Sequence, residues 1–247
     1  MMIPDKMWKW GKVTLPTHLS FQPVTVSKAK LYLLCDFGAG ADGRVWLACN
    51  GDACLAVIKF FNTDKAILVD EMKQKEMKVL EVAKEVRFWH LLGFNQVYQG
   101  LYSNVVSIVL PFAFTYSVGE FNTIEINYSR WNVPSIAQGD VNVPVDDYRN
   151  LALIIGCDSL MEQLNAKIPI IVLRECIQKC IDNQLVHDDI EWRHVGLFPV
   201  PREGADGYDL ISCFIDLTRM HQVESKADAE ESMKVLFEKL VSEPWNV

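Results

Sequence analysis

The sequence predicts an α+β fold with two lobes, in which five antiparallel strands and one long helix precede a reduced, mostly helical part. Three observations support this prediction. Short apolar runs separated by turn signals fill residues 31–61. Good helix formers, with no internal glycine or proline, cover residues 63–92. Residues 146–242 then show two helical patterns, a short hairpin and a closing helix.

The elements of the first lobe follow from apolar runs and turns. Residues 31–49 contain two apolar runs, and the hairpin signal Asn50-Gly51 separates them from a third strand at residues 53–61. Gly93 stands where the long helix needs a C-cap. Residues 96–114 supply two more strands, the second of which ends at a proline. These strands and the helix make up the first lobe.

We divide the chain into a leader (residues 1–30) that packs on the first lobe, the first lobe itself (31–115) and the reduced second lobe (116–247). The second lobe begins with residues 116–150, whose Gly, Pro, Asp and Asn predict an irregular connection. Half of the 247 residues are hydrophobic, which is ample for a core.

Composition argues against several classes of protein. The formal net charge is −8 and the isoelectric point is about 5.2, which disfavours nonspecific binding to nucleic acid or anionic membranes. No apolar run approaches the roughly 20 residues that span a bilayer, and the N-terminus lacks the apolar core of a secretory signal. The seven cysteines are irregularly spaced and predict neither a disulfide framework nor a zinc site. We therefore expect an intracellular protein, cytoplasmic or nuclear.

Three glycines lie between the first two strands, in the segment Gly38-Ala-Gly40-Ala-Asp-Gly43-Arg-Val45. The spacing GxGxxGxV is a weak signal by itself, because dinucleotide-binding folds carry GxGxxG between a strand and a helix. Here a strand stands on each side, which indicates a hairpin that covers phosphate groups. The alternative is a glycine-rich turn that binds no ligand.

Lys59 and an acidic residue of the long helix form a candidate charge pair. Apolar strand residues flank Lys59, so its ammonium needs polar surroundings such as phosphates and a carboxylate; the alternative is an edge-strand lysine that reaches solvent. We predict Glu85 as the partner, because Phe88 and Trp89 would pack one turn further along the helix. Glu81 is the second choice.

Two acidic motifs near the C-terminus complete the pattern. Residues 185–197, Leu-Val-His-Asp-Asp-Ile-Glu-Trp-Arg-His-Val-Gly-Leu, lie after a predicted helix and before a predicted strand. The apolar segment 211–215 ends in Asp216. Together with the glycines and Lys59, these motifs stand in the order found in protein kinases. The chain thus resembles the protein-kinase-like superfamily.

The resemblance implies an ATP site with Mg²⁺ as cofactor. Lys59 would hold the nucleotide phosphates and Glu85 would orient Lys59. Asp189 would accept the proton of the acceptor hydroxyl, and Asp216 would bind the magnesium ion. The nucleotide would contact Gly38, Gly40, Gly43, Val45, Lys59 and, at a hinge that offers backbone groups to adenine, Leu110 and Phe112.

The chain departs from the kinase pattern at several positions. His194 stands where kinases keep an asparagine that binds a second metal ion, so we expect either altered metal use, with Mn²⁺ beside Mg²⁺, or a histidine that orders the loop. His187 is expected to be structural. Asp188 replaces the arginine that would bind an activation-loop phosphate, and Glu191 replaces a lysine. Arg193 either supplies the missing catalytic positive charge or pairs with Glu191.

A narrower resemblance rests on residues 187–198, His-Asp-Asp-Ile-Glu-Trp-Arg-His-Val-Gly-Leu-Phe, together with the segment Ile215-Asp-Leu and the single closing helix. These features resemble the kinase-like C-terminal domains of crinkler-type effectors of oomycetes and fungi. That resemblance implies an effector, which would act in the host cell if it is secreted.

The sequence leaves two functions open. One is an ATP-dependent phosphotransferase that transfers the γ-phosphate to a protein Ser/Thr or to a small-molecule hydroxyl. The other is a pseudokinase that acts as a nucleotide-binding or protein-interaction module. Lys59, Asp189 and Asp216 favour the enzyme, whereas His194 and Glu191 favour the module. Neither the acceptor nor the oligomeric state follows from the sequence.

Overall fold

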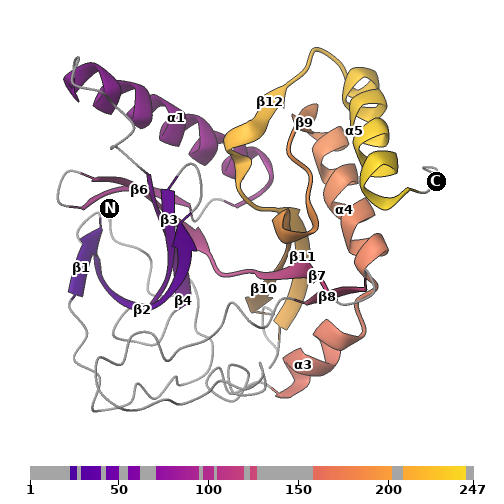
Figure 1. The fold of residues 1–247 in the computed structure, drawn as a ribbon, viewed down its shortest axis with the longest axis horizontal. Helices are drawn as coiled ribbons and strands as arrows, with labels where there is room; N and C mark the ends of the chain where they lie inside the picture. The colour runs from indigo at the N-terminus through magenta and orange to yellow at the C-terminus, as the bar shows by residue number, and fades with distance from the viewer. Residues whose placement is uncertain are drawn as a thin grey trace.

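The chain forms an α+β fold in which antiparallel sheets combine with helices, as predicted (Figure 1). The computed structural model describes residues 23–26, 29–39, 43–49, 55–61, 71–94, 97–102, 105–119, 123–126, 158–201 and 208–242. No helix within these ranges is both long and apolar enough to cross a membrane.

A six-stranded antiparallel sheet carries the glycine segment and Lys59, and its strand order is β1-β2-β3-β4-β6-β5. The strands are β1 (Pro23–Val26), β2 (Ala29–Ala39), β3 (Gly43–Cys49), β4 (Leu55–Phe61), β5 (Tyr98–Tyr102) and β6 (Val105–Pro111). The prediction of five strands missed β1, which lies in the segment assigned to the leader and pairs with β2. β1 begins at Pro23, and proline is compatible with the first position of an edge strand.

A second antiparallel sheet has the order β11-β10-β7-β8 and was not predicted. The sequence indicated only the hairpin of β10 (Val195–Pro201) and β11 (Tyr208–Phe214). β7 (Phe114–Val118) and β8 (Ile124–Ile126) come from the end of the last predicted strand of the first lobe and from the predicted irregular connection. Most of that connection lies outside the described residues.

Four helices are described: α1 (Glu71–Leu91), α3 (Asp158–Asn165), α4 (Pro169–Asp182) and α5 (Lys226–Val241). The first parts of the helices predicted at residues 63–92 and 146–165 lie outside the described ranges. α4 begins with a proline at its first turn, where the missing N–H costs nothing. At the start of α5, the Ser225 side chain accepts a hydrogen bond from the Asp228 N–H and caps the helix. Figure 1 shows α4 and α5 side by side.

The C-terminus of α1 is closed by Gly93, as predicted. Gly93 has φ +93°, in the left-handed region that favours glycine. The Phe94 N–H donates to the Trp89 carbonyl at 2.9 Å and the Gly93 N–H donates to the His90 carbonyl at 3.0 Å. This pair of hydrogen bonds is a Schellman motif, and the ring of Phe94 packs edge-on against Trp89, with 5.2 Å between centroids.

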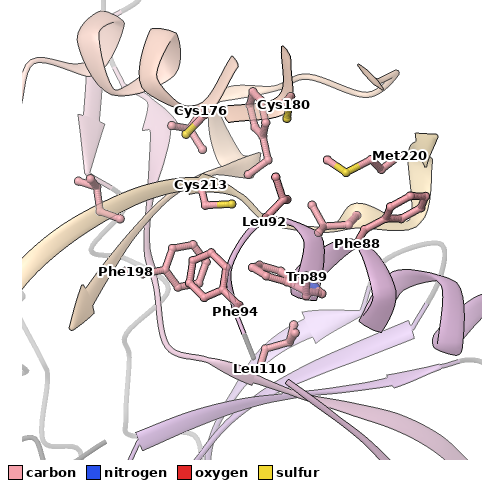
Figure 2. Packing of buried hydrophobic residues seen from close by; sticks show 14 of the residues in the cluster. Phe88, Trp89, Leu92, Phe94, Leu110, Cys176, Cys180, Phe198, Cys213 and Met220 are labelled. Carbon is pink, nitrogen blue, oxygen red and sulfur yellow. The ribbon is translucent and has the colours of Figure 1, made fainter. Parts of the chain in front are cut away.

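An aromatic cluster joins α1 to the second sheet (Figure 2). Phe198 of β10 contacts both Trp89 and Phe94, with ring centroids 5.6 Å and 4.7 Å away. The same core contains three free thiols, those of Cys176, Cys180 and Cys213, which Figure 2 also shows. Burial raises the pKa of the Cys213 thiol to about 12 and raises the pKa values of the other two thiols well above their usual range. These thiols therefore stay protonated and act as small apolar groups.

Candidate functional site

Three charged side chains from distant parts of the chain meet at one place. The Lys59 ammonium, on β4, lies 2.5 Å from Oδ1 of Asp216 and 3.5 Å from Oε2 of Glu85, on α1. Lys59 is 5% exposed and Glu85 is 1% exposed. Glu81, the second choice, is exposed and pairs with Lys78 instead. The structure thus brings the predicted lysine, helix carboxylate and C-terminal aspartate together.

Local structure explains why Lys59 and Glu85 face each other. In the sheet, Lys59 lies opposite Val45 on β3 and opposite Ile108 on β6, so it sits in the interior of the sheet rather than at an edge. Glu85 lies one helical turn before Trp89, which the aromatic cluster buries completely. Residues four apart share a helix face, so the packing of Trp89 also turns Glu85 inward.

Asp216 follows β11 and has an unusual backbone conformation. Its φ is +58° and its ψ is +64°, in the left-handed region, where aspartate is one of the few tolerated residues. The Ile215 N–H donates to the His194 carbonyl at 2.8 Å, and the Thr218 hydroxyl donates to Oδ1 of Asp216 at 3.1 Å. Non-glycine residues hold this conformation only where their surroundings fix it, and they cluster at functional sites.

Two short strands hold the segments that carry the aspartates side by side. β9 (Leu185–His187) pairs with β12 (Met220–Gln222), and the Asp188 N–H donates to the Arg219 carbonyl at 3.3 Å. The end of α1 approaches the same place, where Arg87 donates a hydrogen bond to the Gln222 side chain at 3.4 Å (Figure 1). The sequence analysis missed this pairing because each strand is only three residues long.

The pKa values of the two carboxylates at Lys59 shift in opposite directions. Burial raises the pKa of Glu85, and the Lys59 ammonium offsets this only in part. The Glu85 oxygens have no hydrogen bond of standard geometry, although the nearby Trp89 indole N–H also lowers its pKa. For Asp216, burial opposes ionisation, but Lys59, His194 and the Thr218 hydroxyl outweigh it and lower the pKa below its usual value. Asp216 is therefore the ionised partner of Lys59.

Replacement of Glu85 by Gln is expected to raise the stability of the protein near neutral pH. The folded-state pKa of Glu85 is raised above 4.5, so ionising it costs stability as the pH rises from 4.5 through the folded-state pKa, and the full cost persists above that value. Glutamine removes this cost, and Lys59 keeps Asp216 as its counter-ion. Urea unfolding of both proteins between pH 4 and pH 8 measures the difference. A Glu85→Gln protein less stable than the wild type at pH 7.5 would contradict the assignment.

Two histidines hold the backbone of Asp189. The His187 Nδ1 accepts a hydrogen bond from the Asp189 N–H at 3.2 Å, and its Nε2 lies 3.3 Å from the Ile215 carbonyl. Burial and the neighbouring His194 lower the pKa of His187, so it is a neutral, structural residue. The His194 Nδ1 lies 2.7 Å from the Asp189 carbonyl. No described residue forms a hydrogen bond with the Asp189 carboxylate.

Arg193 pairs with a neighbouring carboxylate on the surface. Its guanidinium forms two contacts with the Glu191 carboxylate, at 2.7 Å from Nε and 3.0 Å from one terminal nitrogen, and both side chains are exposed. The pairing with Glu191 is one of the two alternatives that the sequence left open. The catalytic role of Arg193 stays a prediction. Asp188 also lies at the surface, where its carboxylate is 2.9 Å from Nδ1 of His221.

The structure describes two of the three glycines that were predicted to contact the nucleotide, Gly38 and Gly43. Gly43 is required by packing, because a Cβ added there would lie 2.0 Å from the Phe60 carbonyl oxygen of the neighbouring strand. Gly38 lies opposite Val45 next to a shift in register between β2 and β3. Gly40 lies outside the described residues. The close approach of β4 at Gly43 is a reason for this glycine that needs no ligand.

The predicted hinge residues, Leu110 and Phe112, are buried. Leu110 lies opposite Val57 in the six-stranded sheet, and the Phe112 ring packs edge-on against Phe114, with 4.9 Å between centroids. Their side chains therefore belong to the core, and contact between this segment and adenine stays a prediction. Within the described part of the chain, no three His, Cys, Asp or Glu side chains form a group that could hold a metal ion.

Comparisons with known proteins add little to this geometry. No family model matches the chain, and no curated protein matches it significantly. Among solved structures, the chain is similar to the Rio2 kinase from Chaetomium thermophilum in a complex described as ADP/Mg²⁺-phosphoaspartate, at 14% sequence identity and a TM-score of 0.39. The similarity covers 85% of this chain and 56% of that chain. A TM-score this low does not establish a shared fold, so the interpretation depends on the contacts of this chain.

Proposed function

We propose that this chain is a protein-kinase-like nucleotide-binding protein and that it transfers the γ-phosphate of ATP to a hydroxyl group. The observation that carries the proposal is the meeting of buried Lys59 and Glu85 with half-buried Asp216, which come from a strand, a helix and a C-terminal loop. Desolvating a buried ammonium and its carboxylates can cost more than their mutual attraction returns, and clusters of titratable groups with shifted pKa values are typical of functional sites. In this proposal, residues 31–115 and 116–247 are two lobes, and the nucleotide binds between them.

Each residue has a distinct role in the proposed reaction. Lys59 binds the phosphate oxygens, and Glu85 holds Lys59 in place. Asp189 accepts the proton of the acceptor hydroxyl, whose oxygen forms a bond to the γ-phosphorus as the bond from that phosphorus to the β,γ-bridging oxygen breaks. ADP leaves with the electrons of the broken bond. Such a transfer depends mainly on positioning and on neutralising charge.

The chemistry of Asp216 fits a divalent metal ion. Its carboxylate has a lowered pKa and is therefore ionised, and carboxylate oxygens are ligands that Mg²⁺ accepts. A bound Mg²⁺ ion would neutralise negative charge on the nucleotide phosphates. In this structure the Lys59 ammonium contacts the Asp216 carboxylate. It would turn toward Glu85 and the phosphates when Asp216 binds the ion.

Asp189 is well placed for its proposed role. Both of its backbone groups are held, by His187 and by His194, while its carboxylate has no hydrogen-bond partner among the described residues. A general base needs this combination of a fixed position and a free carboxylate. The acceptor is a protein Ser/Thr or a small-molecule hydroxyl.

A second candidate function is a pseudokinase that binds a nucleotide or a partner protein without turnover. The pairing of Arg193 with Glu191 favours it, because a paired Arg193 does not supply the catalytic positive charge that the loop otherwise lacks. Lys59 then supplies the positive charge at Asp216. The proposed likeness to crinkler-type effectors, with action in a host cell, fits either function and depends on the motif at residues 187–198. Turnover distinguishes the two functions.

Titration of ATP into the purified chain by calorimetry tests the nucleotide site. We expect binding that requires Mg²⁺ or Mn²⁺ and that Lys59→Ala weakens by roughly 10–100-fold, the size expected for losing a hydrogen bond to a charged group. Lys78→Ala, which removes a half-buried lysine paired with Glu81 on the same helix, is the control and should bind like the wild type. Absence of binding with both metal ions would leave only a protein-interaction module.

A further inference from the structure

The hydroxyl of Thr218 comes from a turn that its neighbours hold firmly. Thr218 is the middle residue of a single 3₁₀ turn (Leu217–Arg219), which directly follows Asp216. Leu217 and Met220, before and after it, are each 0% exposed, and the Met220 N–H donates to the Leu217 carbonyl. The turn also contacts α1. These contacts fix the backbone of Thr218 and therefore the place from which its side chain starts.

Asp216 occupies the N-cap position of this turn, but its side chain does not cap it. An aspartate at an N-cap usually accepts a hydrogen bond from a backbone N–H of the turn that follows, and Asp216 forms no such bond. Its Oδ1 instead accepts a hydrogen bond from the Thr218 hydroxyl at 3.1 Å and contacts the Lys59 ammonium at 2.5 Å. One carboxylate oxygen therefore has two partners, a neutral hydroxyl and an ammonium.

These two partners differ in how easily they can leave Oδ1. The Lys59 ammonium stands at the end of a flexible four-carbon chain, and the Glu85 carboxylate lies only 3.5 Å away from it. Threonine is branched at Cβ and is stiff about its first side-chain torsion. If Lys59 moves, the hydrogen bond from Thr218 can therefore stay in place.

We propose that Thr218 is a positioning residue, whose hydroxyl holds the Asp216 carboxylate in place while Lys59 moves from that carboxylate to the phosphates of a bound nucleotide. The inference rests on the proposed function, in which Lys59 binds the phosphates and Asp216 binds a divalent ion. Without the hydroxyl, the departure of Lys59 would leave the carboxylate free to turn about its own side-chain bonds. Binding would then have to order the carboxylate, which costs affinity.

The hydrogen bond of Thr218 is of the kind that supports a metal ligand. Carboxylates that bind metal ions are usually hydrogen-bonded in turn by a neighbouring group, which orients them. Among the described residues, both contacts of the Asp216 carboxylate go to Oδ1, so its second oxygen stays available to an ion. The sequence analysis did not single out Thr218, because one threonine after an acid forms no motif.

Titration of ATP with Mg²⁺ by calorimetry, into Thr218→Val and Thr218→Ser, tests the inference. Valine has the shape of threonine without its hydroxyl, whereas serine keeps the hydroxyl and loses the methyl group. We expect Thr218→Val to bind about 10–100-fold more weakly than the wild type, the usual cost of losing a partner of a metal ligand. Thr218→Ser should bind like the wild type. Thr123→Val removes an exposed hydroxyl that donates to Glu125 and is the matched control.

Urea unfolding without nucleotide distinguishes positioning from a structural role. In the free protein, Lys59 still contacts Oδ1, so Thr218→Val should unfold at nearly the same urea concentration as the wild type. A turn that needs the hydroxyl only for stability would show the reverse, a lower midpoint with unchanged affinity in the folded protein, and would overturn the inference. Thr218→Ala also lacks the hydroxyl and should lose the same affinity, so it replaces Thr218→Val if valine does not fit the turn.

The outcomes separate this inference from the proposed function. Failure of ATP to bind to the wild type with Mg²⁺ would overturn both. Wild-type affinity in Thr218→Val and Thr218→Ala would overturn the positioning role and leave the nucleotide site intact. An equal loss in Thr218→Ser and Thr218→Val would also overturn it, because the methyl group and not the hydroxyl would then matter.

Discussion

Replacement of Asp189 by Asn should lower turnover by about 10²–10⁴-fold, the usual contribution of a general base. The substitution keeps the shape of the side chain and removes its ability to accept a proton. His187 accepts a hydrogen bond from the Asp189 N–H and His194 bonds to the Asp189 carbonyl, so both bonds involve backbone atoms and the loop should keep its conformation. Nucleotide affinity, measured by calorimetry, should therefore remain unchanged, while the rate of ADP formation falls.

Asp188→Asn is the matched control for this prediction. Asp188 is the adjacent acid, but it is exposed and pairs with His221 at the surface. We expect its turnover to match the wild type. Equal loss in both variants would indicate a general effect on the loop, and a wild-type protein that binds ATP without any turnover would identify the pseudokinase.

The pairing of Lys59 with the long helix could be predicted because the information is local. A lysine flanked by apolar strand residues, and a helix in which Phe88 and Trp89 follow Glu85 by one turn, each specify which side chain points inward. Glu81 lies one turn earlier on the same helix face, so the large apolar residues that follow Glu85, and not the helix period alone, favoured Glu85 over Glu81, which is exposed. Periodicity on one face is the most reliable signal in a single sequence.

The second sheet could not be predicted in the same way. β7 pairs with β10 through Thr115 opposite Gly196 and Phe114 opposite Leu197. The partners lie far apart in the sequence, the paired segment is short, and no turn signal connects them. Nonlocal pairing of this kind depends on how the whole chain folds, and local patterns contain no record of it.

The contacts of the charged loop residues were also beyond the sequence. Arg193 had two possible uses, and only the conformation of the loop decides that it meets Glu191. Likewise, the direct contact between Lys59 and Asp216 depends on the left-handed backbone of Asp216, which no residue pattern specifies. The charged groups are evident in the sequence, whereas their pairing depends on how the loops fold.

Replacement of Trp89 by Ala is expected to reduce the free energy of unfolding by about 3–5 kcal/mol, the range for large aromatic residues in cores. Trp89 is fully buried, and its ring packs edge-on against Phe94 and Phe198. Alanine leaves a cavity between α1 and β10 that the rigid rings cannot fill. Urea unfolding followed by circular dichroism measures the loss.

Leu80→Ala is the control on the same helix. Leu80 is 69% exposed, so its truncation should change the free energy of unfolding by no more than about 0.5 kcal/mol, as for most surface substitutions. Trp89→Phe keeps a ring in the cluster and removes an indole N–H that lacks a standard hydrogen bond, so its cost should lie between the two. A loss below 1 kcal/mol in Trp89→Ala would contradict the packing of α1 on β10.

The same substitution connects packing to the proposed site. Glu85 lies one turn before Trp89, and its inward orientation depends on how firmly that turn packs. Trp89→Phe should therefore weaken ATP binding more than Leu80→Ala does, although neither side chain is proposed to touch the nucleotide. Measurement of both affinities by calorimetry, at a temperature where each variant is folded, shows whether the aromatic cluster holds the Glu85 carboxylate at Lys59. Equal affinities in the two variants would mean that Glu85 keeps its place without the cluster.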